Sequence, residues 1–93
     1  MPQYTVAIHK TVNKVKSKLP KANLNSFNKW INDLKKDPFT CHDGIFKAIK
    51  FQGDGPVYKK RFGDYRACFV IIEKEVKVLV FKLMHRKEVY KKK

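Results

Sequence analysis

Arginine is rare in this chain, and its three occurrences, Arg61, Arg66 and Arg86, all fall in the last third of the sequence. The remaining basic residues, out of 22 in total, are lysine. A guanidinium group grips phosphate oxygens through two parallel hydrogen bonds, whereas a lysine ammonium acts as a point charge. A single arginine is more often a surface charge than a ligand. Together they indicate a phosphate-binding site, provided that the fold brings them to one place.

The overall charge supports an anionic partner. Twenty-two Lys and Arg residues face eight Asp and Glu residues, which gives a formal net charge of +14 and a pI near 10. Self-repulsion on this scale favours a compensating partner, which could be nucleic acid, an anionic membrane surface or an acidic protein. Phosphate binding is the commonest use of such a charge, so nucleic acid is the leading candidate. A lysine surface that is simply solvated is the alternative.

The cysteines and histidines do not indicate a metal site, and we expect no metal or other cofactor. Two cysteines are too few for a disulfide framework. Cys41 and His42 could form half a zinc site, but His9 and His85 have no companions at ligand spacing. The sequence shows neither a signal peptide nor an apolar run long enough to cross a bilayer. We therefore expect a cytoplasmic protein with no membrane partner.

The N-terminal part predicts a strand and two helices. Tyr4–Ile8 alternates and is rich in β-formers, and it is followed by apolar residues at helical spacing up to Pro20, which cannot continue a helix. The second helix has a stronger apolar stripe and is closed by Asp37 and Pro38. The stripes consist of Val12, Val15 and Leu19 in the first helix and of Leu24, Phe27, Trp30, Ile31 and Leu34 in the second.

Three β-rich segments follow, at residues 57–62, 65–73 and 76–84, with a shorter strand expected at 45–51. The order predicts one α+β domain over residues 1–93, in which β-α-α is followed by an antiparallel β meander. The two N-terminal helices are expected to pack on one face of a small twisted sheet.

The Gly63-Asp64 pair predicts the register of the first hairpin. A two-residue loop with glycine first is typical of a type II′ turn. It places Phe62 opposite Tyr65, Arg61 opposite Arg66, and Lys59 opposite Cys68. Facing side chains in such a ladder lie only about 5 Å apart at Cβ, so two arginines in this position are destabilising unless an anion lies between them.

The second hairpin, with Lys74-Glu75 as its loop, extends this face. It predicts Cys68 opposite Phe81 and Arg66 opposite Leu83, with His85 on the same face and Arg86 directly after it. We expect the apolar residues of that face, Val70, Ile72, Leu79 and Phe81, to lie under the helices. Five groups then gather where the helices no longer cover the sheet, in a shallow phosphate-binding concavity: Lys59, Arg61, Arg66, His85 and Arg86.

Residues 57–66, VYKKRFGDYR, and 85–90, HRKEVY, closely resemble the RelE branch of the RelE/ParE toxin superfamily. Residues 1–56 match more weakly. The shared features are the first strand, the Leu-Pro pair that separates the two helices, and the Asp-Pro-Phe sequence that ends the second helix. The resemblance implies a RelE-like fold and the toxin of a type II toxin–antitoxin system. It also implies a metal-independent endoribonuclease that cleaves mRNA in the ribosomal A site by attack of the RNA 2′-hydroxyl. The implied partners are an acidic RelB-like antitoxin, the ribosome with its mRNA and rRNA, and operator DNA through the antitoxin.

Carried over position by position, the active-site pattern falls on Lys59, Arg61, Arg66, Arg86 and Tyr90. Arg61 and Arg66 suit stabilisation of the phosphorane, Arg86 suits the leaving oxygen, and Tyr90 suits stacking on a base. The RNA-binding set is Lys59, Lys60, Arg61, Arg66, Lys87 and Lys91.

The chain departs from some relatives at one point, because Arg61 stands where they have a lysine thought to act as general base. Arginine does not readily give up its proton. Lys59 could be the base if neighbouring cations favour its neutral form, and His85 could be the base because histidine titrates near neutral pH. Catalysis that is mostly electrostatic and slow is the third possibility, so His85 joins the catalytic candidates.

Two other functions compete with this interpretation. A ParE-like toxin would inhibit DNA gyrase and would cut no RNA, although ParE-type members tend to lack the combined Arg66, Arg86 and Tyr90 pattern. A non-catalytic RNA-binding or DNA-binding module would bind through the same cations without cleavage.

Overall fold

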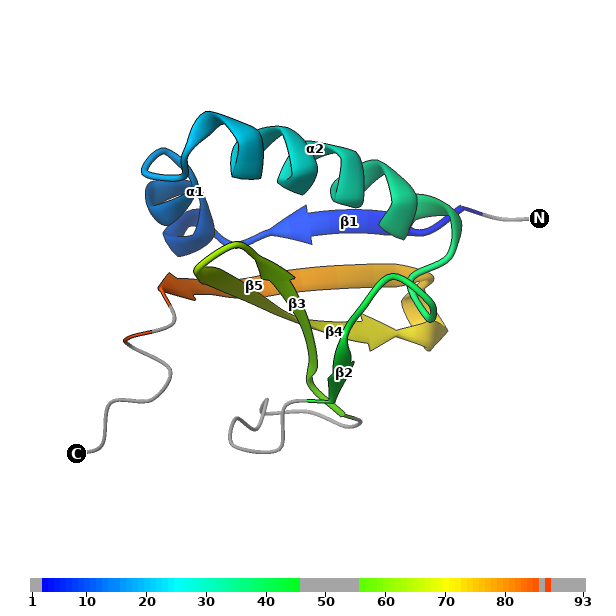
Figure 1. The fold of residues 1–93 in the computed structure, drawn as a ribbon. Coiled ribbons are helices and arrows are strands. Elements are labelled where there is room, and N and C mark those ends of the chain that lie inside the picture. The colour runs from blue at the N-terminus through cyan, green and yellow to red at the C-terminus, as the bar shows by residue number, and fades with distance from the viewer. Residues whose placement is uncertain (1–2, 46–55, 86, 88–93) are drawn as a thin grey trace.

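A computed structural model describes residues 3–45, 56–85 and 87 of the chain (Figure 1). Helix α1 spans Lys10–Lys16, and its first turn is capped by His9, whose Nδ1 accepts a hydrogen bond from the Thr11 amide at 3.1 Å. Helix α2 spans Lys21–Lys36. The predicted break at Pro20 is confirmed, although α1 ends three residues before Leu19 and the chain reaches that buried leucine through a turn. No helix in the described ranges is long and apolar enough to cross a bilayer.

The strands form one mixed sheet in the order β1-β5-β4-β3-β2. Neighbouring strands are antiparallel except β1 and β5, which pair in parallel. The α+β order and the three-stranded meander are therefore as predicted. Of the short strand expected at 45–51, β2 contains Ile45, and residues 46–51 lie outside the described ranges. The strands are β1 (Thr5–Ile8), β2 (Gly44–Ile45), β3 (Tyr58–Phe62), β4 (Tyr65–Ile72) and β5 (Lys77–His85).

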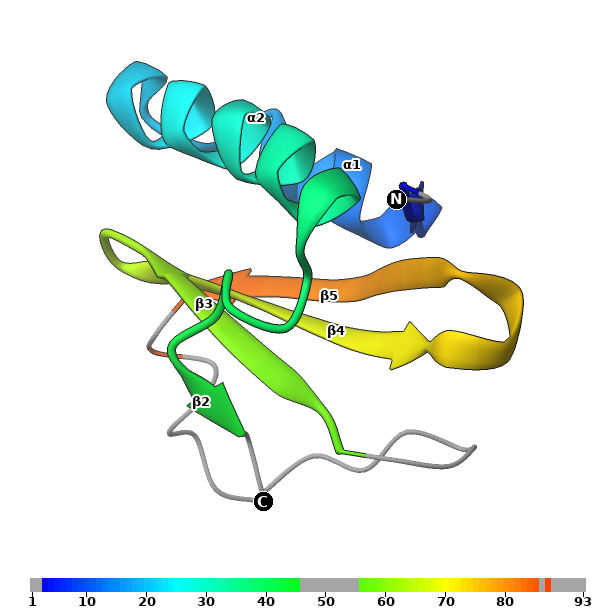
Figure 2. The same ribbon diagram turned by 90° about the vertical axis from the view of Figure 1, so that its right-hand side faces the viewer.

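Both helices lie on one side of the sheet (Figure 2). Their apolar stripes pack on the inward-facing side chains of β3, β4 and β5. The centre of this core is aromatic. The centroid of the Trp30 ring lies 5.2 Å from that of Phe62 and 5.4 Å from that of Phe69, and both pairs meet edge-on. Edge-to-face pairs of this kind add roughly 0.5–1.5 kcal/mol each to the gain from burial. The predicted helix layer is thus confirmed and is fixed by large rings.

The side of the sheet that the helices cover differs from the prediction. Val70, Ile72, Leu79 and Phe81 belong to a second apolar cluster, built around Val57, Cys68 and Met84. Their strand neighbours of the opposite parity, such as Phe69 and Val80, lie under the helices instead. Successive residues of a strand point to opposite faces, so the choice of face is all-or-none. Burial of the large Phe62 and Phe69 rings against Trp30 decides it.

The register of β4 and β5 also changes along its length. A 3₁₀ turn at Glu73–Glu75 and a left-handed Val76, with φ of 51°, replace the predicted two-residue loop. From Ile72 opposite Lys77 to Phe69 opposite Val80, the pairing is nevertheless that of the predicted ladder.

A β-bulge then shifts the ladder by one residue, with Phe81 as the extra residue. Beyond it Cys68 lies opposite Lys82 and Arg66 lies opposite Met84. The predicted pairs with Phe81 and Leu83 are therefore wrong. The physical reason is burial, because the bulge lets both Val80 and Leu83 reach the helix-side core.

Candidate functional site

The β3–β4 hairpin brings two arginines face to face, as predicted. Arg61 pairs with Arg66 and Phe62 pairs with Tyr65 across a Gly63-Asp64 turn. Gly63 has φ of +61° and Asp64 does not share this left-handed conformation, as expected of a type II′ turn. The turn packs on α2, because a Cβ atom at Gly63 would lie only 2.6 Å from Nδ2 of Asn23.

Two rows of side chains cross the face of the sheet that points away from the helices. The first row is Arg61, Arg66 and Met84, and the second is Lys59, Cys68 and Lys82, each contributed by β3, β4 and β5 in turn. Residues in such rows share a face. Four cations therefore gather over the second apolar cluster, and we call Lys59, Arg61, Arg66 and Lys82 the basic face.

The cations of the basic face influence the pKa of the Cys68 thiol. Burial raises its pKa from 9.0 to about 11, while the charges of Lys82, Arg66 and Lys59 act in the opposite direction. Desolvation of the charged form dominates. The thiol is therefore protonated and fully buried beneath three cations, and it is not suited to act as a nucleophile.

Lys82 is the member of the basic face that sequence reasoning missed. In an unbroken ladder Lys82 would face Ala67, which is completely buried on the helix side. A lysine in that position would have lost its hydration without a partner. The conflict between a charged residue and a buried face becomes visible only once Ala67 is known to lie under the helices, so the sequence pattern alone did not reveal the bulge.

Asp43 forms hydrogen bonds with the edge of β3, the strand that carries Lys59 and Arg61. Its carboxylate accepts a hydrogen bond from the Arg61 amide at 2.7 Å, and its own amide donates to the Lys59 carbonyl at 2.7 Å. The next residue, Gly44, pairs with Lys59, and a Cβ atom there would lie 3.6 Å from Cε of Lys59. The Lys59 side chain thus lies close to the Gly44 backbone. Asp43 already occupies hydrogen-bonding groups on this edge of β3.

His85 does not join the basic face, which corrects the prediction. The bulge places it opposite Tyr65, and the two rings meet edge-on with centroids 5.1 Å apart. Tyr65 packs on the helix-side core, so His85 lies on the side of the sheet opposite Arg66. Its Nδ1 accepts a hydrogen bond from the Lys87 amide at 3.1 Å.

The remaining predicted residues divide into two groups. Lys60 lies between Lys59 and Arg61 in β3, so its side chain points to the helix side of the sheet. Lys87 is exposed just after β5. Arg86, Tyr90 and Lys91 lie outside the described residues. Within the ranges that are described, no group of three His, Cys, Asp or Glu side chains lies together in a way that could hold a metal ion.

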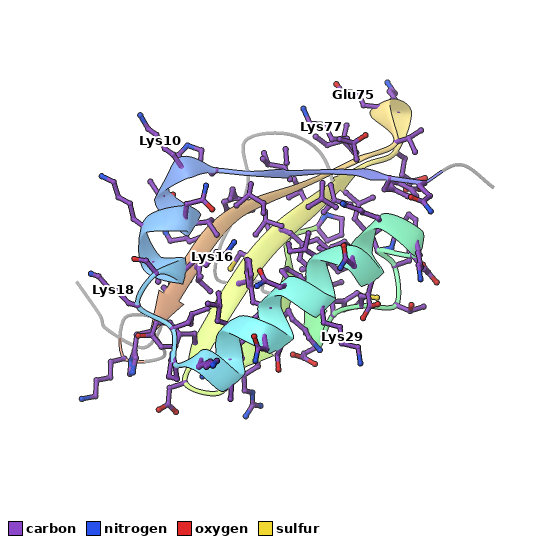
Figure 3. The ribbon with its side chains drawn as sticks, turned by 90° about the horizontal axis from the view of Figure 1, so that it is seen from above. Lys10, Lys16, Lys18, Lys29, Glu75 and Lys77 are labelled. Atoms are coloured by element: carbon purple, nitrogen blue, oxygen red, sulfur yellow. The ribbon has the colours of Figure 1, made fainter. Side chains whose placement is uncertain are left out.

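A pocket of about 490 Å³ opens between α2 and the edge of β3. Figure 3 shows Lys29 on the flank of α2 that faces away from α1, which is the flank that borders the pocket. Arg61 and Lys60 line its other wall. Arg61 thus belongs both to this pocket and to the basic face.

The similarity to known proteins covers almost the whole chain. No family model matches the sequence. A Methanocaldococcus jannaschii protein that bears the toxin name RelE1 is 32% identical over 89 residues, which is 96% of this chain and 97% of that protein.

Solved structures show the same architecture. The archaeal RelE–RelB complex from Pyrococcus horikoshii matches with a TM-score of 0.73 and 33% identity, covering 90% of this chain and 96% of that one. The RelBE2 toxin–antitoxin complex from Mycobacterium tuberculosis matches with a TM-score of 0.68 and 24% identity, over 92% and 94% of the two chains, which shows a shared fold. With its two-helix layer, its mixed five-stranded sheet and its full-length match to a named relative, this chain belongs to the RelE family of toxins.

Proposed function

We propose that this protein is the toxin of a type II toxin–antitoxin pair and acts in the cytoplasm as an endoribonuclease that cleaves mRNA in the ribosomal A site. The observation that carries the proposal is the facing pair Arg61 and Arg66 within the basic face. Two guanidinium groups directly across a ladder repel each other, and an anion between them removes this cost. The phosphate of a bound RNA strand is such an anion.

The reaction needs three changes of charge. The 2′-hydroxyl loses a proton as its oxygen attacks the adjacent phosphorus, the dianionic phosphorane is stabilised, and the departing 5′-oxygen gains a proton. Arg61 and Arg66 stabilise the phosphorane through charged hydrogen bonds that are strongest when its negative charge is greatest. These cations supply the charge that a metal ion provides in other nucleases, so the proposed mechanism is metal-independent. Arg86 stabilises the negative charge on the leaving oxygen, which takes its proton from solvent, and Tyr90 stacks on a base.

The geometry favours Lys59 over His85 as the group that accepts the proton. Lys59 shares a face with Arg61 and Arg66, whereas the His85 ring lies against Tyr65 on the other side of the sheet. A general base must lie within hydrogen-bond reach of the proton that it removes. Lys59 lies on the same face as a phosphate held between the arginines, and its flexible side chain suits this role.

The proposed antitoxin is a RelB-like chain with acidic segments. The Pyrococcus horikoshii relative was solved as a complex of RelE with RelB. An acidic chain that covers the basic face compensates part of the +14 charge and blocks the substrate. Contact with operator DNA is then made through the antitoxin.

The test is cleavage of a defined mRNA on programmed ribosomes. We expect Arg66→Ala and Lys59→Ala to lower the cleavage rate about 100-fold or more, because each removes a group that acts on the reacting atoms. His85→Ala should lower it less than tenfold. Lys74→Ala is the matched control, since it removes one positive charge from the turn at the opposite end of β4.

Other outcomes would replace the proposal. Equal loss in Lys74→Ala would reduce the role of Arg66 to nonspecific charge. RNA binding by the wild type without any cleavage would favour a binding module, and inhibition of gyrase supercoiling without cleavage would favour a ParE-like toxin.

A further inference from the structure

The outer edge of β3 changes its hydrogen-bond partner at Arg61. Strand β2 begins at Gly44, which pairs with Lys59, so Arg61 lies beyond the end of that ladder. The Arg61 main-chain amide donates instead to the Asp43 carboxylate at 2.7 Å. A hydrogen bond to an ionised carboxylate is shorter and stronger than one to a neutral carbonyl. A side chain thus takes the place of a neighbouring strand at the residue that carries the guanidinium group.

The hairpin turns the Arg61 amide away from β4. Phe62 and Tyr65 flank a two-residue loop, and the residues that flank such a loop form a hydrogen-bonded pair. The pairs of an antiparallel ladder alternate, so Arg61 and Arg66 form the next, non-hydrogen-bonded pair, whose Cα atoms lie only about 4.5 Å apart. Repulsion between guanidinium groups is strongest in this closer kind of pair. The bond to Asp43 holds the Arg61 backbone against that repulsion from the outer edge.

Asp43 also links the two residues that β3 contributes to the basic face. Its amide donates to the Lys59 carbonyl at 2.7 Å, while its carboxylate accepts from the Arg61 amide. Residues two apart in a strand point to the same face, so these two bonds together fix the directions in which both cationic side chains leave the strand. Because the main-chain N–H groups of a strand lie close to the plane of the sheet, the carboxylate lies at the edge of the sheet rather than over the basic face.

The segment that carries Asp43 is anchored just before this residue. The Trp30 indole donates to the Cys41 carbonyl at 2.7 Å, which ties the segment to α2. The His42 ring lies against the ring of Tyr58, with centroids 4.5 Å apart, which ties it to β3. A supporting residue acts with precision when its own backbone is fixed by such contacts. Asp43 is therefore held in place to bond β3.

We propose that Asp43 is a positioning residue of this site, which holds Arg61 opposite Arg66 and beside Lys59 in the arrangement that receives a phosphate. This inference rests on the proposed function, because it names the residue that arranges the cations of the proposed reaction. Misplacement of a reacting or stabilising group by about 1 Å lowers a rate by up to about 100-fold, so loss of the bond has a measurable effect.

Cleavage of a defined mRNA on programmed ribosomes by Asp43→Ala and Asp43→Asn tests this role. We expect Asp43→Ala to lower kcat about 10- to 100-fold, because Arg61 is then misplaced when the phosphorane forms. KM should change by less than about threefold, since the other cations still bind the RNA. Asp43→Asn retains an oxygen that accepts from the Arg61 amide and should restore kcat to within about threefold of the wild type.

Asp37→Ala is the matched control. It removes the same charge from the same connection, but the Asp37 carboxylate accepts from the Phe39 amide and the Thr40 hydroxyl rather than from β3. We expect this variant to cleave at the wild-type rate. Thermal unfolding of every variant identifies a temperature at which all of them are folded, and the rates are compared there.

The side-chain Nε–Hε resonance of Arg61 follows the same arrangement without any cleavage. It is titrated with a short single-stranded RNA whose 2′-hydroxyls are methylated, so that they cannot attack the phosphate. We expect this RNA to shift the resonance in the wild type, Asp43→Asn and Asp37→Ala. The shift in Asp43→Ala should be at least about threefold smaller, because the guanidinium group no longer meets the phosphate in the same geometry.

Several results would overturn the inference. A wild-type kcat in Asp43→Ala, or an equal loss in Asp37→Ala, would show that the bond to β3 has no part in catalysis. A loss in Asp43→Asn as large as in Asp43→Ala would assign the effect to the negative charge instead of the hydrogen bond. If the wild type cleaves no mRNA, the proposed function fails, and the Arg61 resonance decides the role of Asp43 alone: equal shifts in the wild type and Asp43→Ala would exclude it.

Discussion

Within the basic face, each residue type has a distinct part that follows from its chemistry. Arg61 and Arg66 are permanent cations and suit charge stabilisation, whereas Lys59 is able to exchange a proton. Cys68 lies between Lys59 and Lys82 in the second row, next to Arg66 on the same face, and is completely buried. A small apolar side chain in this position lets the cations approach one another without a competing polar group below them.

The Cys68 thiol gives a prediction on stability at high pH. Burial raises its pKa to about 11, above its ordinary value of 9.0, so the folded state favours the protonated thiol. Below pH 9 the thiol is protonated in both states and adds no pH dependence. As the pH rises from 9 to 11, only the unfolded chain ionises, and stability falls by about 2–3 kcal/mol in total.

Urea denaturation of the wild type and Cys68→Ala between pH 8 and 11 checks this prediction. The lysines titrate in both proteins, so their contribution cancels in the comparison. The variant starts less stable but should lose about 2–3 kcal/mol less than the wild type over this range. Parallel curves would show that the folded thiol ionises like a solvated one. Cys41→Ala, at a half-buried position, is the control and should follow the wild type.

At the scale of the elements, the Gly63-Asp64 turn joins the two arginine-bearing strands and also contacts α2. We expect Gly63→Ala to destabilise the protein by about 1–3 kcal/mol, because alanine disfavours φ of +61° and its Cβ would meet Asn23 at 2.6 Å. Thermal or urea unfolding measures the loss.

A double-mutant cycle separates the two causes. Asn23→Ala removes the steric contact but leaves the backbone conformation unchanged, so Gly63→Ala should cost less in that background. If the cost is the same in both backgrounds, the contact between the turn and α2 contributes nothing. Such a result would leave the backbone of the turn alone to position Arg61 opposite Arg66.

The net charge of +14 acts on the whole molecule, but only some of its cations share one surface. Binding of RNA releases counterions, so the logarithm of the binding constant falls with the logarithm of salt concentration. For a single strand the slope is about −0.7 for each phosphate that the protein neutralises.

Lys82 tests whether the basic face is the surface that meets RNA. We expect Lys82→Ala to reduce the steepness of the salt dependence by about 0.7, because it removes one phosphate contact. Fluorescence anisotropy with a short single-stranded RNA between 50 and 300 mM salt, a range over which screening changes strongly, measures the slope. Lys74→Ala is the charge-matched control and should leave the slope unchanged. An unchanged slope in Lys82→Ala, or an equal change in the control, would argue against this surface.

The sequence by itself determined the local features. Pro20 separates the helices because proline cannot continue a helix, and Gly63-Asp64 fixes the register of the first hairpin because a two-residue loop leaves one pairing. From that register alone, Lys59, Arg61 and Arg66 fall on one face. These signals are short-range, so no knowledge of distant contacts is needed to interpret them.

Only the tertiary structure decided which face the helices cover and where the ladder shifts. Both choices depend on contacts between residues far apart in the chain: the rings of Phe62 and Phe69 against Trp30, and the reach of Leu83 into the same core. The bulge that follows from them moves Lys82 onto the basic face and takes His85 off it. A one-residue shift reverses the face of every later side chain, so the membership of the site depends on packing that the sequence pattern does not encode locally.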